Sequence, residues 1–193
     1  GNAHLTFELM LREMDGLLPV LVFLGTSGVL LFALTYAKPH PRLYLFSFYI
    51  CMFGASMICL VQAQDFFVLF TAWESIGVSS YVLIGYVHTR LDSLRSGYKA
   101  LVMNRVGDFA FVVLVAVALC VWHSTQLDVI GVSLWLSASS YVPTGLCTVC
   151  VFLACYCKSA QYMFHDWLFD AMEGMTPVSA LLHSATLVTA GTV

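Results

Sequence analysis

Apolar runs of about twenty residues recur along this chain and constrain what it can fold into. A helix needs roughly 20 residues to cross the hydrocarbon core of a bilayer, which is about 30 Å thick. The runs predict six membrane-spanning helices, near residues 17–37, 43–62, 66–87, 107–122, 142–157 and 177–193. The expected fold is therefore an all-α polytopic membrane protein.

The charge content supports a lipid environment and argues against nucleic acid as a partner. Only 10% of the 193 residues are charged, against about 25% in an ordinary soluble domain. The formal net charge of -3 provides no broad cationic surface. The N-terminal stretch contains three acidic residues, which is unlike a targeting presequence. Membrane lipids are the expected surroundings.

Basic residues fall in alternate connections between the predicted spans. Lysine and arginine occur in the first, third and fifth connections, whereas the second and fourth contain none. By the positive-inside rule, the odd-numbered connections face the cytoplasm or the mitochondrial matrix. The third connection, 88–105, is typical of an amphipathic interfacial helix that runs into the fourth span. Segment 129–141 is too short to span, so we expect it at the interface, with Trp135 and Tyr141 at headgroup depth.

Two carboxylates lie inside the predicted spans. An ionisable side chain at the bilayer centre costs at least about 2.5 kcal/mol on insertion scales. Glu74 lies close to the middle of the third span, where the alternative to a functional role is a neutral, hydrogen-bonded structural glutamate. Asp108 follows Arg105 by three residues at the start of the fourth span. It is either functional or an acidic residue of a first helical turn paired with Arg105.

A lysine and a histidine complete the set of intramembrane ionisable residues. Lys158 could extend from a helix end to the membrane surface. The apolar stretch continues past it and breaks at His165–Asp166, which instead indicates a helix interrupted within the membrane beside a polar cavity. His183 lies on a face of small and polar residues that suits either a proton relay or close helix packing.

Together, Glu74, Asp108, Lys158 and His183 are the ingredients of a proton wire. Burial disfavours the charged forms of lysine and carboxyl groups and an ion pair favours them, so movement of one partner can decide whether the lysine holds its proton. Cys147 and Cys150 form a CxxC without a second pair at metal-site spacing. The sequence therefore predicts no metal site and no bound cofactor in this chain.

Four motifs match one known family in order and spacing: LFTAWESIGVSSYVLIGY, NRVGD, KSAQ with HDWL, and DAMEGMTPVSALLHSATLVTAG. They resemble subunit 5 of NADH dehydrogenase, the respiratory complex I, and its bacterial equivalent. The resemblance covers residues 38–193, whereas 1–37 resembles only a generic membrane helix. We expect 1–193 to form a single membrane domain, with 38–193 as the first half of an antiporter-like module.

The resemblance implies a fold with two inverted repeats, of which this chain holds one, with a broken helix near Lys158. It implies that Glu74 pairs with Lys158, and that Asp108 and His183 lie further along the proton path. The driving force is quinone reduction in another subunit. NADH, FMN, Fe-S clusters and ubiquinone are then cofactors of the parent complex. The implied location is the mitochondrial inner membrane, or alternatively a bacterial plasma membrane.

The sequence departs from the family in composition and in length. The family usually has Gly at the position of Cys157 and Pro at the positions of Phe169 and Met175, all near the broken helix. Because the second repeat is lacking, we expect a separate chain to carry the second half of the subunit, besides other membrane-arm subunits as partners. Two alternatives stay open: an Mrp-type sodium/proton antiporter, which shares KSAQ but lacks NRVGD, and a scaffold of the membrane arm that does not pump.

Overall fold

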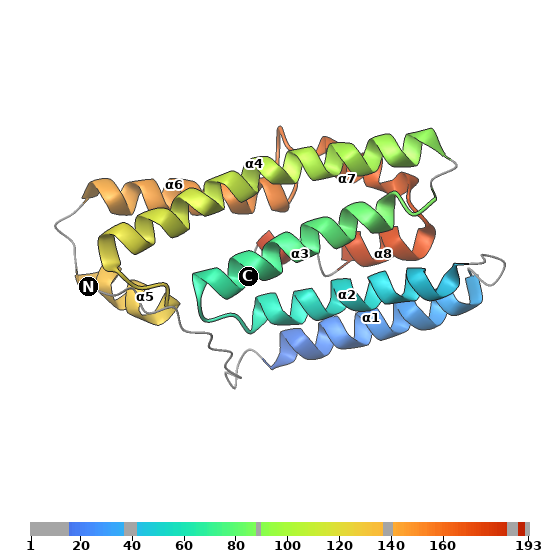
Figure 1. Ribbon diagram of the computed structural model, residues 1–193, viewed down its shortest axis with the longest axis horizontal. Coiled ribbons are helices and arrows are strands. Elements are labelled where there is room, and N and C mark those ends of the chain that lie inside the picture. Colours follow the sequence, from blue (N-terminus) through green and yellow to red (C-terminus); the bar gives the residue numbers. More distant parts are fainter. Residues whose placement is uncertain (1–15, 37–41, 88–89, 137–140, 185–188, 192–193) are drawn as a thin grey trace.

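The computed structural model describes residues 16–36, 42–87, 90–136, 141–184 and 189–191, which are almost entirely helical (Figure 1). The elements in chain order are α1 (Leu17–Tyr36), α2 (Leu43–Val61), α3 (Phe66–Ile84), α4 (Leu91–Trp122), α5 (Leu127–Leu136), α6 (Tyr141–Lys158), α7 (Asp166–Asp170), the 3-10 turn η1 (Ala171–Glu173), α8 (Thr176–Ser184) and the 3-10 turn η2 (Thr189–Gly191). The predicted all-α fold is confirmed.

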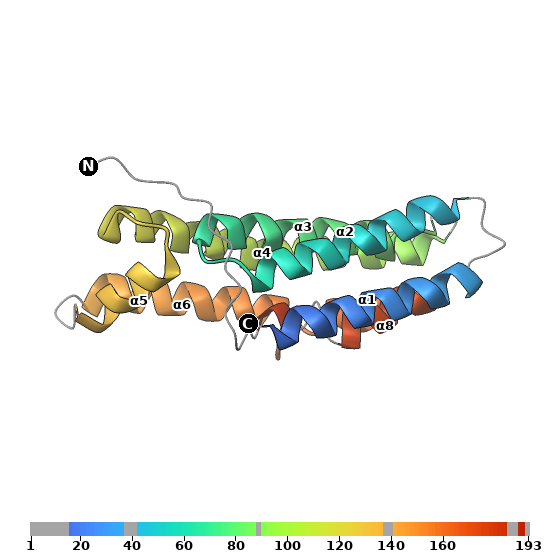
Figure 2. The same ribbon diagram turned by 90° about the horizontal axis from the view of Figure 1, so that it is seen from below.

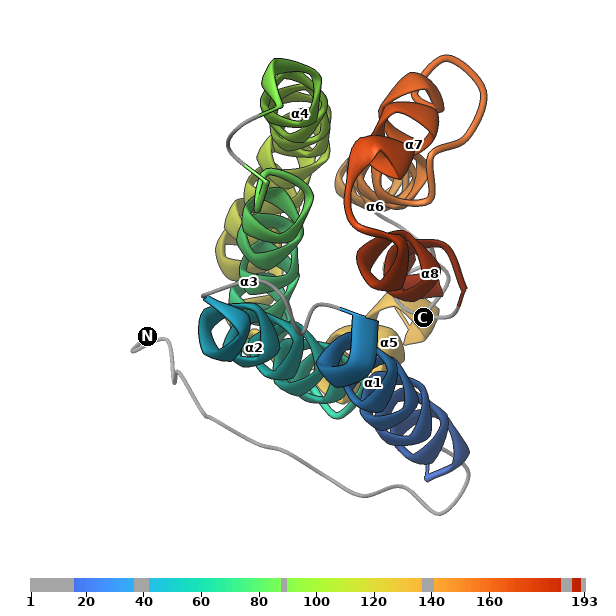
Figure 3. The same ribbon diagram turned by 90° about the vertical axis from the view of Figure 1, so that its right-hand side faces the viewer.

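The first four helices pack in sequence order as an arc. Figure 3, which looks along the bundle, shows α4, α3, α2 and α1 side by side, each in contact with the next. The segment from α6 to α8 forms a second row, in which α6 and α7 lie against α4 while α8 lies against α1 and α3. Figure 2 shows α6 along one half of the long axis and α8 along the other. The second row thus closes the arc.

Four described helices, α1 to α4, are long and apolar enough to cross a membrane. They correspond to the first four predicted spans, and the fifth corresponds to α6, in which Thr144–Lys158 is a shorter apolar helix. The sixth was expected as one helix running to residue 193. Instead α8 contains only nine described residues and a 3-10 turn follows at Thr189. Residues 185–188 lie outside the described part of the chain.

Helix α4 joins two elements that the sequence separated. The amphipathic segment and the fourth span form one continuous helix of 32 residues. Most of its inward-facing residues are small or polar, such as Ser93, Gly97 and Asn104, and the larger ones are Phe111 and Leu114. Small residues let helix backbones approach closely in a membrane, where lipid is as apolar as the side chains. This pattern explains why α3 and α6 can both pack on α4.

The broken helix that the resemblance implied near Lys158 is present, and it begins earlier than the hydropathy pattern indicated. We expected the interruption at His165–Asp166, but α6 ends at Lys158 and helix resumes at Asp166. Ala160 (φ 53°) and Met163 (φ 79°) adopt left-handed backbone conformations that an α-helix cannot continue through. The apolar character of residues 162–164 concealed the break, since hydropathy does not report backbone direction.

Two connections are tied together at the end of the bundle where α5 lies. The Phe66 amide donates to the Thr125 carbonyl and the Leu127 amide donates to the Gln64 carbonyl, both at 2.9 Å. Asp65 and Gln126 thereby form an isolated antiparallel bridge. The segment 129–141 that we predicted to be short is represented by α5, a helix of ten residues. The side chains of Trp135 and Tyr141 lie outside the described part.

Candidate functional site

Lys158 is the last residue of α6 and its side chain is buried in the centre of the bundle, with 1% of its surface exposed. The ammonium donates to the Trp73 carbonyl at 3.1 Å and lies 4.9 Å from the centroid of the Trp73 ring. A buried lysine that reaches a backbone carbonyl and an aromatic face is held in place rather than extended to the membrane surface. The surface-seeking interpretation of Lys158 is therefore wrong for this structure.

Asp108 lies in the middle of α4 and faces inward, with 6% of its surface exposed. One carboxylate oxygen accepts a hydrogen bond from the Trp73 indole at 2.9 Å, and the other lies 3.7 Å from the Arg105 guanidinium. Since α4 begins at Leu91, Asp108 does not belong to a first helical turn. Trp73 touches both Asp108 and Lys158, so it links the two charges.

Glu74 pairs with Arg105 in this structure, and not with Lys158 as the resemblance implied. The Glu74 carboxylate lies 2.6 Å from the Arg105 guanidinium, and the exposed fractions of the two side chains are 33% and 47%. Among the described side chains, Lys158 has no carboxylate within 4.0 Å. Arg105 therefore lies between Glu74 and Asp108 and contacts both.

Two glycines allow the helices of the site to approach closely. A Cβ atom at Gly107 would lie 3.0 Å from the Cys157 Cβ and 3.3 Å from the Ala154 carbonyl oxygen, so α4 and α6 are in backbone contact beside Lys158. A Cβ atom at Gly77 would lie 3.5 Å from the Lys158 ammonium. The absence of side chains at Gly77 and Gly107 therefore lets α3, α4 and α6 pack closely around Lys158.

A small cavity adjoins the charged residues between α3 and α4. It is lined by Glu74, Gly77, Val78, Leu101, Asn104, Arg105 and Asp108. Asn104 is 3% exposed, and both polar atoms of its amide lack a hydrogen-bond partner among the described residues. A buried amide without partners is rare and normally has a structural or functional explanation.

The fourth predicted residue is not joined to this cluster by any described contact. His183 lies in the last turn of α8, but its side chain is outside the described part of the chain. The helix that carries it contacts α1 and α3. Its role stays a prediction.

Three participants were not identified as site residues from sequence: Trp73, Arg105 and Asn104. Each is adjacent to, or within four residues of, a predicted carboxylate, so the TAWE and NRVGD motifs contain them. The usable signal was the periodicity of α4, because Asn104, Gly107, Asp108 and Phe111 recur at three or four residues and so share one face. Trp73 is held against Phe111, with ring centroids 5.6 Å apart.

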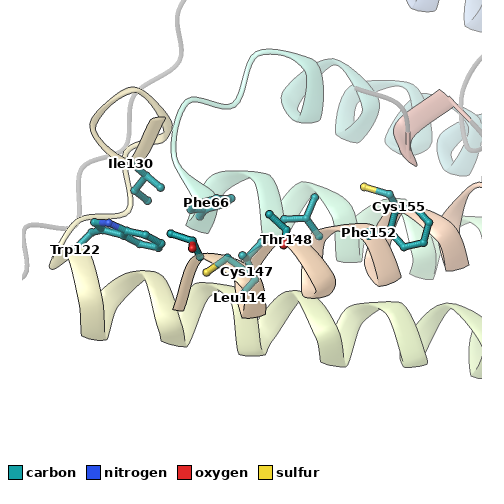
Figure 4. A pocket seen from close by; sticks show the side chains of 10 residues that line it. Phe66, Leu114, Trp122, Ile130, Cys147, Thr148, Phe152 and Cys155 are labelled. Atoms are coloured by element: carbon teal, nitrogen blue, oxygen red, sulfur yellow. The ribbon is translucent and has the colours of Figure 1, made fainter. Parts of the chain in front are cut away.

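A separate pocket of about 390 Å³ lies where α3, α4, α5 and α6 meet (Figure 4). Figure 4 shows apolar side chains from these helices, with Phe66, Leu114 and Trp122 around it. It contains no charged group, and it does not include any residue of the cluster around Lys158. This pocket is therefore separate from the cluster around Lys158.

Metal-binding groups do not gather in the described part of the chain. No three of its His, Cys, Asp or Glu side chains are arranged to hold an ion. All seven cysteines carry free thiols, including Cys147 and Cys150 of the CxxC. The donor set therefore does not fit a metal ion or an Fe-S cluster.

Known proteins resemble this chain over most of its length. The family model for the NADH:quinone oxidoreductase/Mrp antiporter transmembrane region matches residues 63–193. NADH-ubiquinone oxidoreductase chain 5 of Rhizopus stolonifer is 41% identical over 178 residues, which is 91% of this chain and 26% of that one. Chain 5 of Chlamydomonas reinhardtii is 42% identical over 169 residues, 86% of this chain and 29% of that one. This chain thus spans less than a third of the length of these relatives.

A solved structure shows the same fold. The Mrp complex from Dietzia sp. matches with a TM-score of 0.68 and 32% sequence identity, covering 74% of this chain and 16% of that chain. The match extends over most of the described bundle.

Proposed function

This chain belongs to the NADH:quinone oxidoreductase/Mrp antiporter transmembrane family, and we propose that it forms a proton half-channel in the membrane arm of respiratory complex I. The curated relatives at 41% and 42% identity are chains of NADH-ubiquinone oxidoreductase. The chain carries no redox centre in this proposal and contributes to the enzyme as a translocating subunit. The single observation that carries the proposal is the buried ammonium of Lys158 at a helix break.

Lys158 is the proton-holding group of the proposed half-channel. A buried ammonium is costly, and here it is stabilised by the Trp73 carbonyl and ring and by carboxylates in its surroundings. An environment that only just compensates the charge allows a small rearrangement to change the protonation state. A residue that served packing alone would not need this charge.

Glu74 is the proposed movable partner. Its carboxylate is held by Arg105, and both side chains are partly exposed, which leaves them room to change rotamer. When Glu74 turns from Arg105 toward Lys158, the added negative charge favours the ammonium. Its return to Arg105 favours release of the proton. Asp108 is held in place by the Trp73 indole, so it does not move with Glu74.

His183 is the proposed continuation of the path, in the next helix toward the C-terminus. An imidazole can accept and donate a proton near neutral pH. The proton reaches it from Lys158 and passes on to groups beyond this repeat. Residues of a second repeat, carried by a separate chain or by further sequence, complete the channel.

The proposed location is the mitochondrial inner membrane, with other membrane-arm subunits and lipids as partners. NADH, FMN, Fe-S clusters and ubiquinone act in other subunits of the parent complex in this proposal. Quinone reduction elsewhere supplies the free energy. Moving one charge against 100 mV takes about 2.3 kcal/mol, so the transfer must be gated.

The test is a Glu74→Gln variant in the assembled complex, measured as protons translocated per NADH oxidised in sealed membrane vesicles. We expect normal assembly and poor translocation, because the amide keeps the size of the side chain and removes its charge. Glu173→Gln, the same change at an exposed residue outside the cluster, is the matched control. A normal proton-to-electron ratio in the assembled Glu74→Gln enzyme would overturn the role given to Glu74.

A Lys158→Ala variant tests the proton-holding group with the same measurement. We expect assembly with little translocation, whereas Lys99→Ala, which removes a half-exposed lysine, should pump normally. If substitution of all four residues, Glu74, Asp108, Lys158 and His183, leaves pumping intact, the chain is a scaffold and the proposal fails.

The second candidate function is that of an Mrp-type sodium/proton antiporter subunit, favoured only by the match to the Mrp complex structure. It would show sodium-dependent proton flux in vesicles without NADH. The curated relatives favour the complex I function. Sodium-independent pumping driven by NADH would exclude the antiporter.

A further inference from the structure

Asn104 is the one residue of the cluster whose polar groups are fully enclosed and have no partner in the described chain. Neither the amide oxygen nor the amide nitrogen has solvent-exposed surface, so no other protein chain can reach them. A buried amide that makes no hydrogen bond costs about 1–3 kcal/mol. The residue must therefore bind something small that is already inside the protein.

The cavity beside Asn104 has the size and the lining for one water molecule. It measures about 10 Å³, the volume that a single water requires. Besides Asn104, its walls include the charged residues Glu74, Arg105 and Asp108. A buried water typically makes about three hydrogen bonds. The residues that line this cavity offer both hydrogen-bond donors and hydrogen-bond acceptors.

Gly77 is the wall of this cavity on the side of Lys158. It lines the cavity, and a Cβ atom there would lie 3.5 Å from the Lys158 ammonium. Because glycine has no side chain, no Cβ atom lies beside the ammonium at this position. Glycine in the middle of a helix is unfavourable by about 0.5–1 kcal/mol relative to alanine, so its presence in α3 has a local reason.

We propose that Asn104 and Gly77 form a one-water site that passes protons between the Glu74 carboxyl group and the Lys158 amino group. Asn104 anchors the water through its amide, and the open position at Gly77 lets that water reach the ammonium. The water accepts a proton from one side as it gives one to the other, so it is unchanged after each transfer. Both are positioning residues. The inference rests on the proposed proton-translocating function.

A Gly77→Ala variant of the assembled complex tests the opening. The added methyl fits in ordinary van der Waals contact, so assembly should be unaffected, while its volume displaces the water from the ammonium. We expect proton translocation to slow by about tenfold, as for the loss of one hydrogen bond in the transfer step. Gly28→Ala in α1, where no atom lies within 4 Å, is the matched control and should pump normally.

Asn104→Leu tests the anchor. It should slow translocation by a similar factor, and Asn104→Ser, which restores a hydroxyl and leaves room for water, should recover part of the rate. Ser96→Ala removes another buried polar group of α4, whose hydroxyl bonds only to the Ser93 carbonyl, and should have no effect. Normal rates in assembled Asn104→Leu and Gly77→Ala would overturn the site.

The two proposals fail in distinguishable ways. If Glu74→Gln and Lys158→Ala lose translocation while Asn104→Leu and Gly77→Ala keep it, the water site is wrong and the proposed function stands. If all four variants pump normally, both the water site and the proposed function are wrong. Should a variant not assemble, an electron cryo-microscopy map of the unmodified complex decides. A density peak about 2.7–3.2 Å from the Asn104 amide is expected, and an empty cavity at a resolution that shows other buried waters overturns the site.

Discussion

The pair α1–α2 and the group α3–α4–α6 are adapted to the lipid environment in opposite ways. Neither α1 nor α2 contains a charged residue, and α1 buries only Val22 and Ala33, leaving most of its apolar side chains exposed. The other group encloses Asp108 and Lys158 and holds Glu74 against Arg105. In lipid, apolar surface can stay outside while polar groups must be enclosed. The first region presents apolar surface, and the second encloses the ionisable residues of the proposed proton path.

The largest expected difference between the regions concerns the removal of a buried charge. Asp108→Leu deprives the Trp73 indole of its acceptor and leaves the nearby cations with one carboxylate fewer. Leaving a buried donor unsatisfied costs about 1–3 kcal/mol, and loss of the ion pair with Arg105 adds to this cost, so the assembled complex should melt at a clearly lower temperature. Asp108→Asn, which keeps an acceptor, should melt closer to the unmodified complex. Equal melting of Asp108→Leu and wild type would show that the cluster is not a stability determinant.

Backbone contact between helices gives the next effect. Gly107→Ala places a methyl 3.0 Å from the Cys157 Cβ and 3.3 Å from a carbonyl oxygen, an overpacking that should cost about 1–3 kcal/mol. Gly25→Ala in α1 meets no atom within 4 Å and should gain up to about 1 kcal/mol from helix propensity. Denaturation of the two variants in detergent compares them. If Gly107→Ala and Gly25→Ala changed the free energy of unfolding in the same direction, the close approach of α4 and α6 would be contradicted.

Substitution of alanine by glycine should change the free energy of unfolding in opposite directions in the two regions. Ala160 has φ 53°, a left-handed conformation that costs a residue with a Cβ roughly 1–2 kcal/mol, so Ala160→Gly should stabilise by about 1 kcal/mol. Ala33→Gly in α1 should destabilise by about 1 kcal/mol or more, because it removes a buried methyl from a helix. Thermal unfolding of the two purified variants checks this. A destabilising Ala160→Gly would disprove the left-handed turn after α6.

The smallest effect is expected at an exposed ion pair. Lys99 and Asp170 lie 2.7 Å apart and are 41% and 43% exposed, and they connect α4 to α7. Lys99→Met should destabilise by about 0.2–1 kcal/mol, with the difference shrinking as salt is raised. A large effect that does not depend on salt would mean that this contact fixes the segment after the break.

Hydropathy was sufficient to predict most spans, because lipid imposes one simple requirement on each helix. The bounds of α1, α2 and α3 lie within three residues of prediction. One feature of the helices could not be predicted from hydropathy. The break after Lys158 depends on the backbone angles of Ala160 and Met163, which apolar side chains do not reveal.

The charged residues were predictable, whereas their partners were not. An intramembrane Glu or Lys is conspicuous in sequence, but Glu74 and Arg105 are 31 positions apart. Their pairing follows from how α3 lies on α4, which the inward small residues of α4 determine. The Lys158 contact with Trp73 crosses 85 positions for the same reason. Tertiary packing, and not local pattern, selected these partners.

The end of α6 at Lys158 has an electrostatic consequence. Peptide dipoles add along a helix, so its C-terminal end carries about half a negative elementary charge. Because α6 ends at the buried residue Lys158, this fixed charge lies inside the bundle, on the helix that carries the ammonium. Such an interaction is worth about 0.3–1 kcal/mol at surfaces and up to about 2 kcal/mol when partly buried. It cannot swing away or take up a proton, so the backbone provides the constant field against which the side chains act.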